Sequence, residues 1–92
     1  ICLDENDSEN YIIGVAATNE TDKKASFSNF GSRCVDISAP GRRIFTTMVY
    51  HKDLPNYNEY YGGYWSGTSL AAPLVSGAGV LVKSINPLMN AK

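Results

Sequence analysis

The feature that most constrains the fold is an apolar segment near the C-terminus. Residues 69–86 are predicted to form a helix that ends before Pro87, because proline disfavours the helical conformation at the residue preceding it. From Leu70 to Val82 almost every position is apolar or small, so no polar face exists before Lys83. A helix that is apolar on all sides is buried on all sides. We therefore expect this helix to lie at the centre of the fold.

Small residues within this helix point to close packing. Ser76, Gly77 and Gly79 leave room for neighbouring elements to approach the helix backbone. Each glycine inside a helix costs about 0.5–1 kcal/mol, which close packing would offset. The Gly-x-Gly spacing does not indicate a nucleotide-binding loop, since it lies inside the helix rather than before one.

Upstream of the helix the pattern predicts short strands. A nearly continuous apolar run over residues 11–18 is typical of a strand covered on both faces. Residues 34–38 and 43–50 predict two further strands, and residues 51–63 have the composition of a hairpin tip before a returning strand at 64–66. Strands followed by one buried helix indicate an α/β protein.

Length and charge limit the function. A chain of 92 residues forms at most one small domain. The net charge of −1, without a basic block, does not indicate nucleic acid as a partner. We expect no membrane span, and the first ten residues do not resemble a signal peptide. Without an initiator methionine, the chain is expected to be incomplete at both ends.

The chain has two cysteines, Cys2 and Cys34. They allow one disulfide or two free thiols, and the spacing does not distinguish these alternatives. Neither cysteine has the spacing of a zinc or redox motif.

The residues Gly67, Thr68 and Ser69 at the start of the helix allow two interpretations. A hydroxyl there can cap the helix by accepting an N–H of the first turn. Alternatively, Ser69 is a nucleophile: Pro73 has no N–H for the carbonyl of Ser69, which loosens the first turn, and the positive helix end suits a developing oxyanion. The residues alone leave both interpretations open.

The segment "GTSLAAPLVSG", residues 67–77, resembles the nucleophile signature of the subtilisin-like serine peptidases, the subtilases. Upstream, "IIGVAAT", "ASFSNFG" and "VDISAPG" resemble three further blocks of that family in the same order. The resemblance covers residues 11–87. It implies that residues 1–92 are the C-terminal portion of one catalytic domain, with a three-layer α/β/α fold, a mainly parallel sheet, a hairpin and a buried central helix.

The resemblance also implies residue roles. Ser69 would be the acyl-forming nucleophile, with its N–H as an oxyanion donor. Thr68 would lie beside the oxyanion, Gly67 would let the substrate backbone approach, and Trp65 would border the leaving-group side of the cleft. The chain departs from the family at Leu74, where most members have a histidine that is structural and outside the catalytic triad.

A serine hydroxyl is a weak nucleophile without a base held by a third group. The Asp and His blocks of the family precede its serine and are absent from residues 1–68, as is the oxyanion Asn, so an upstream part of the same protein would supply all three. His51 lies in a polar loop and is expected to be a surface residue. Asp36 is expected to organise backbone.

The predicted function is therefore a serine endopeptidase acting on protein or peptide substrates, with residues 1–92 inactive alone. The alternative is a catalytically silent subtilase-like binding or scaffolding module. The family implies a secreted or extracytoplasmic protein. It makes calcium conceivable as a cofactor, but the acidic start departs from the family at the expected site, and no cofactor is assigned. A solvated loop is the favoured reading of its four carboxylates, Asp4, Glu5, Asp7 and Glu9.

Five of the six tyrosines lie within residues 50–64. Beside a nucleophile, the exposed aromatics of this segment, Tyr60 and Tyr61 among them, would form a cleft wall on the leaving-group side. Alternatively, cross-strand tyrosine pairs stabilise the hairpin. Both alternatives are open at this point.

Overall fold

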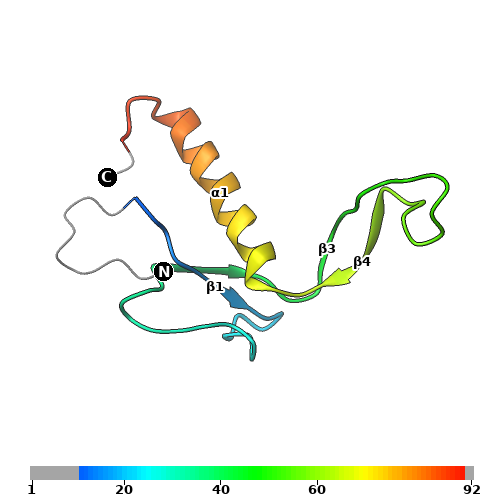
Figure 1. Cartoon of the computed structure of the whole chain (residues 1–92). Helices are drawn as coiled ribbons and strands as arrows, with labels where there is room; N and C mark the ends of the chain where they lie inside the picture. Colours follow the sequence, from blue (N-terminus) through cyan, green and yellow to red (C-terminus); the bar gives the residue numbers. More distant parts are fainter. Residues whose placement is uncertain (1–10, 91–92) are drawn as a thin grey trace.

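The computed structural model describes residues 11–90, in which four strands precede one helix (Figure 1). The strands are β1 (Val15–Thr18), β2 (Ile37–Pro40), β3 (Ile44–Thr47) and β4 (Tyr61–Trp65), and the helix is α1 (Thr68–Ile85). The arrangement agrees with the predicted α/β class, and α1 begins and ends one residue before its predicted bounds.

β1 and β2 form a parallel pair, with Val15 opposite Ile37 and Thr18 opposite Pro40. The two central residues of β1 are buried alanines, as a strand covered by another element requires. The predicted first strand began at residue 11, but regular pairing begins only at Val15, because β2 itself begins opposite that residue.

A polar loop connects β1 to β2, and its own side chains shape it. Asn19 Oδ1 accepts the N–H groups of Thr21 and Lys23, both at 3.0 Å, and so closes a tight turn. Further on, the buried Ser28 accepts the N–H of Ala17 at 2.9 Å and donates to a neighbouring carbonyl. The loop is thereby hydrogen-bonded to β1.

α1 packs on both strands of the parallel pair, and the core between them is small. Its buried apolar residues are four alanines, Ala17, Ala25, Ala39 and Ala71, flanked by the partly buried Val15 and Val75. Because alanine side chains are short, the helix and the strands lie close together.

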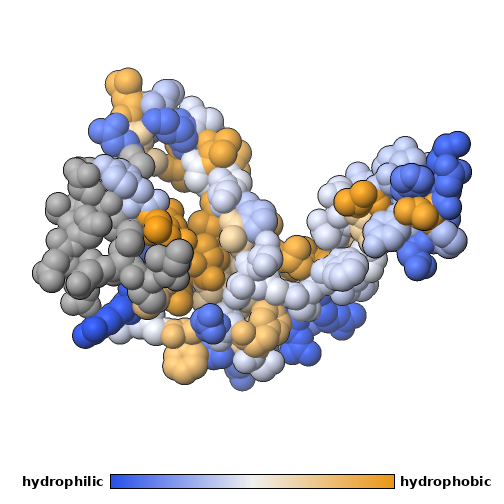
Figure 2. Space-filling model, in the orientation of Figure 1, coloured by the Kyte–Doolittle hydropathy of each residue, from blue (hydrophilic) through white to orange (hydrophobic). Residues whose placement is uncertain are grey.

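The expected burial of the helix is wrong for this chain. Ala71 is the buried residue of α1, whereas Leu81 is 68% exposed and Ile85 is 85% exposed. Figure 2 shows apolar side chains at the surface beside the helix. The physical reason is that β1 and β2 cover only one side of the first turns, and no other described element packs extensively on α1.

A related expectation is also corrected. A Cβ placed on Gly77 or Gly79 would meet nothing within 4 Å among the described residues, so no close packing explains these glycines here. Separately, α1 is long and apolar enough to qualify as a membrane span by length and composition alone, a test that does not overturn the expectation of no membrane span. The core helix of a soluble protein passes the same test.

β3 and β4 form an antiparallel hairpin that extends away from α1 as an arm (Figure 1). Ile44 lies opposite Trp65, and the register shifts between Phe45 and Thr46. Such an irregularity bends a strand and increases its twist. The predicted hairpin is confirmed, with a tip that begins and ends a few residues earlier than expected.

The described residues contain one parallel pair, one antiparallel pair and one helix. The three-layer fold and the mainly parallel sheet therefore stay predictions. Cys34 is disulfide-bonded. Two free thiols are thereby excluded, and Cys2, the other cysteine of the chain, lies outside the described residues.

Candidate active site

Ser69 is the second residue of α1, and its hydroxyl does not cap the helix. The N-cap residue is Gly67, whose backbone is extended, and the helix start has no side-chain cap hydrogen bond. The capping interpretation is therefore wrong for both Thr68 and Ser69. Within residues 11–90 the Ser69 hydroxyl makes no hydrogen bond, so it is available for chemistry.

The first turns of α1 contain Pro73. Proline offers no N–H to the carbonyl four residues earlier, which is that of Ser69. The positive end of the helix and the N–H groups of its first turn lie beside this serine. An anion that forms next to Ser69 would be stabilised by both.

Ser69 opens onto a cavity of about 420 Å³ between the start of α1 and the arm. The predicted residues Gly67 and Trp65 line the same cavity. The Trp65 indole N–H donates to the carbonyl of Gly62 at 3.0 Å, which fixes the ring beside the cavity. The structure thus brings three of the four predicted site residues together.

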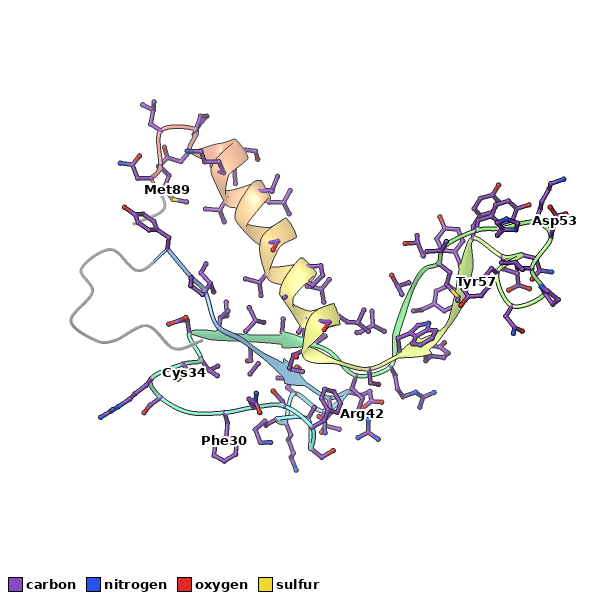
Figure 3. All side chains as sticks on the ribbon, viewed as in Figure 1. Phe30, Cys34, Arg42, Asp53, Tyr57 and Met89 are labelled. Atoms are coloured by element: carbon purple, nitrogen blue, oxygen red, sulfur yellow. The ribbon has the colours of Figure 1, made fainter. Side chains whose placement is uncertain are left out.

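Thr68 lines a different cavity, also of about 420 Å³, together with Cys34 and Asn29. The two cavities lie on opposite sides of the start of α1. In Figure 3, Cys34 is labelled on one side and Tyr57, from the Ser69 cavity, on the other.

Tyr57, from the tyrosine-rich segment that offered a cleft wall, also lines the Ser69 cavity. Sequence reasoning missed the other lining residues: Thr46, Thr47, Met48, Val49, Ser66 and Leu70. Ser66 and Leu70 could have been found, since they adjoin the signature. No such signal marks residues 46–49, because only the fold of the arm brings them to the serine.

His51 and Asp36 lie where the sequence predicted. His51 is exposed in the tip of the arm, and its Nδ1 accepts the N–H of Asp53 at 3.4 Å. Asp36 Oδ2 accepts the N–H of Gly14 at 2.7 Å, which confirms its backbone-organising role. Neither residue lines the Ser69 cavity.

Within residues 11–90 no group of three or more His, Cys, Asp or Glu residues could hold a metal ion. The acidic segment with Asp4, Glu5, Asp7 and Glu9 lies outside the described residues.

A serine presented at a helix start beside a cavity, in an α/β protein, is an arrangement that serine hydrolases use. The chain belongs to the subtilase family, whose sequence model matches residues 3–92. The predicted resemblance is thereby confirmed.

Individual relatives agree with this family. The chain is 42% identical to an extracellular protease of Xanthomonas campestris over 76 residues, which are 83% of this chain and 13% of that protein. It is 41% identical to the cell wall-associated protease of Bacillus subtilis over 80 residues, 87% of this chain and 8% of that protein. It is 43% identical to subtilisin NAT of Bacillus subtilis subsp. natto over 75 residues, 82% of this chain and 17% of that protein. The chain thus spans less than a fifth of the length of these relatives.

Proposed function

We propose that Ser69 is the nucleophile of a serine endopeptidase, and that residues 1–92 are the C-terminal portion of its catalytic domain. The observation that carries the proposal is the uncapped hydroxyl of Ser69, which opens onto a cavity at the positive end of α1. A serine retained only for helix stability would use its hydroxyl as a cap.

In the proposed reaction, Ser69 Oγ attacks the carbonyl carbon of the peptide bond. Its proton passes to a base and then to the leaving amine, and the C–N bond breaks to leave an acyl-serine ester. Water, activated by the same base, then hydrolyses the ester and releases Ser69. The N–H of Ser69 would donate to the oxyanion, with Thr68 beside it.

The base, its orienting acid and the oxyanion Asn would come from an upstream part of the same protein. The exposed apolar surface of α1 supports this assignment, because a helix so apolar needs a cover that the described residues do not supply. The upstream part would thus complete both the active site and the three-layer fold. Residues 1–92 alone would be inactive and poorly soluble.

The Ser69 cavity would receive the leaving-group side of the substrate. Its walls are mostly apolar, and Trp65 and Tyr57 offer ring surface to a peptide side chain. Gly67, without a side chain, would let the substrate backbone approach Ser69.

We also propose that the parent protein acts outside the cytoplasm. Two of its relatives are named as extracellular proteases, from Xanthomonas campestris and Dichelobacter nodosus. The disulfide at Cys34 agrees with an oxidising compartment.

The test is labelling of the complete protein with a serine-directed fluorophosphonate, combined with peptide hydrolysis. Ser69→Ala should abolish both and leave the melting temperature nearly unchanged. In a subtilisin, loss of the nucleophile lowers kcat about 10⁶-fold. Ser76→Ala is the matched control, because Ser76 lies in the same helix and donates to the carbonyl of Ala72.

Two outcomes would contradict the proposal. If the folded complete protein does not label, the silent binding module replaces the peptidase. If isolated residues 1–92 label rapidly at Ser69, a local group such as His51 activates the serine and the upstream base is not needed.

A further inference from the structure

The segment from Gly41 to Arg43, directly after β2, is hydrogen-bonded to the turn that precedes Ser69. The N–H of Gly67 donates to the carbonyl of Gly41 at 2.8 Å, and the N–H of Arg43 donates to Ser66 Oγ at 3.0 Å. Figure 3 labels Arg42, which lies between Gly41 and Arg43 in the chain, close to the first turn of α1. Ser66 and Gly67, which precede the candidate nucleophile in the chain, are thus held by a segment outside the helix.

Gly41 is buried where three elements meet. Its own N–H donates to the carbonyl of Thr18 at the end of β1, at 3.0 Å. A Cβ at Gly41 would lie 2.6 Å from the Cβ of Ala17, 2.9 Å from the carbonyl oxygen of Gly67 and 3.3 Å from the Cβ of Ala71. The first two distances are shorter than real Cβ contacts, so even a methyl group requires a displacement.

A displacement of Gly67 would reach Ser69 directly. The carbonyl of Gly67 accepts the N–H of Leu70 at 3.0 Å, so the oxygen that a Cβ would push belongs to the first turn of α1. Ser69 lies between these two residues. Ala17 and Ala71 are fully buried, so the β1 side and the helix side leave no space for the methyl group.

We infer that Gly41 is a positioning residue for Ser69: its missing side chain sets how closely the start of α1 approaches β1, and its carbonyl holds the N-cap. The inference rests on the proposed role of Ser69. Gly41 does not line the Ser69 cavity, so it acts through Gly67 rather than on the substrate.

The experiment is Gly41→Ala in the complete protein. Misplacement of a reacting group by about 1 Å can lower a rate about 10²-fold. We therefore expect kcat and the rate of fluorophosphonate labelling, each per folded molecule, to fall about 10²-fold, with KM nearly unchanged. A variant that only loses stability would keep both rates per folded molecule.

A second-site variant separates positioning from packing. Ala17→Gly removes the Cβ that lies 2.6 Å from the added methyl group and leaves the contact with the Gly67 oxygen. In the double variant Ala17→Gly/Gly41→Ala, the melting temperature should recover in part while labelling stays slow. Ala17→Gly alone is the control and should label at the wild-type rate.

If Gly41→Ala does not fold, the second hydrogen bond tests the same inference. Ser66→Ala removes the acceptor of the Arg43 N–H, and this contact lies outside the core. The variant should therefore be labelled several-fold more slowly by a small fluorophosphonate, with an unchanged melting temperature. Ser66→Thr, which keeps the hydroxyl, should restore the rate.

The outcomes distinguish this inference from the proposed function. If the wild-type protein labels at Ser69 and folded Gly41→Ala labels equally fast, Gly41 is not a positioning residue and the proposed function stands. If labelling recovers with stability in the double variant, the role of Gly41 is packing. If Gly41→Ala does not fold and Ser66→Ala labels like the wild type, the contact between the Gly41–Arg43 segment and the turn before Ser69 does not position the serine, and the inference fails. If the folded wild-type protein does not label, both proposals fail.

Discussion

Ser28→Ala tests how the loop between β1 and β2 is held on the core. Ser28 is 4% exposed, and its hydroxyl accepts the N–H of Ala17, a fully buried residue, at 2.9 Å. The same hydroxyl donates to the carbonyl of Asn29 at 3.0 Å. Replacement by alanine leaves a buried donor without its acceptor, which costs about 1–3 kcal/mol. We expect the free energy of unfolding to fall by about 2 kcal/mol.

The assay is urea denaturation of the complete protein in a Ser69→Ala background, which excludes self-digestion. With a typical slope of about 2 kcal/mol per molar urea, the midpoint should move down by about 1 M at unchanged slope. Hydrogen exchange at the Ala17 amide should also accelerate. Ser26→Ala, an exposed serine in the same loop, is the control and should change stability by less than about 0.5 kcal/mol. Equal midpoints for the two variants would refute the role of Ser28.

Two further predictions concern the arm and Asp36, the residue before β2. Tyr57→Ala should alter cleavage preference in a peptide library more than it alters stability, since Tyr57 lines the Ser69 cavity. Tyr60→Ala should instead lower the free energy of unfolding by about 0.5–1.5 kcal/mol, because the Tyr60 ring stacks on Tyr50 with centroids 4.1 Å apart. These roles would be contradicted if Tyr57→Ala mainly lowered the melting temperature and Tyr60→Ala mainly changed cleavage preference. Asp36→Ala should lower the free energy of unfolding by about 1 kcal/mol, because the Gly14 N–H loses its carboxylate acceptor. Asp36→Asn keeps an oxygen there and should lower it less. Equal melting temperatures for Asp36→Ala and the wild type would contradict a stabilising role for this hydrogen bond.

Local chemistry allowed much of the fold and the site to be predicted. The bounds of the helix followed from its apolar run and Pro87, and the hairpin followed from turn residues between short apolar runs. The backbone-organising role of Asp36 and the family itself were also readable, because each depends on residues that are near one another in the chain.

The sequence by itself determined that Ser69 would begin an apolar helix after a glycine turn, since helix propensity and the position of Pro73 act within a few residues. Only the tertiary structure decided that neither Thr68 nor Ser69 caps that helix and that Tyr57 reaches the Ser69 cavity. It also decided that most of α1 lies exposed. The reason is that cavities and burial depend on which distant segments meet: β3 pairs with β4 to form the arm, and the hydrogen bond from Gly67 to Gly41 holds the residue at which the helix begins.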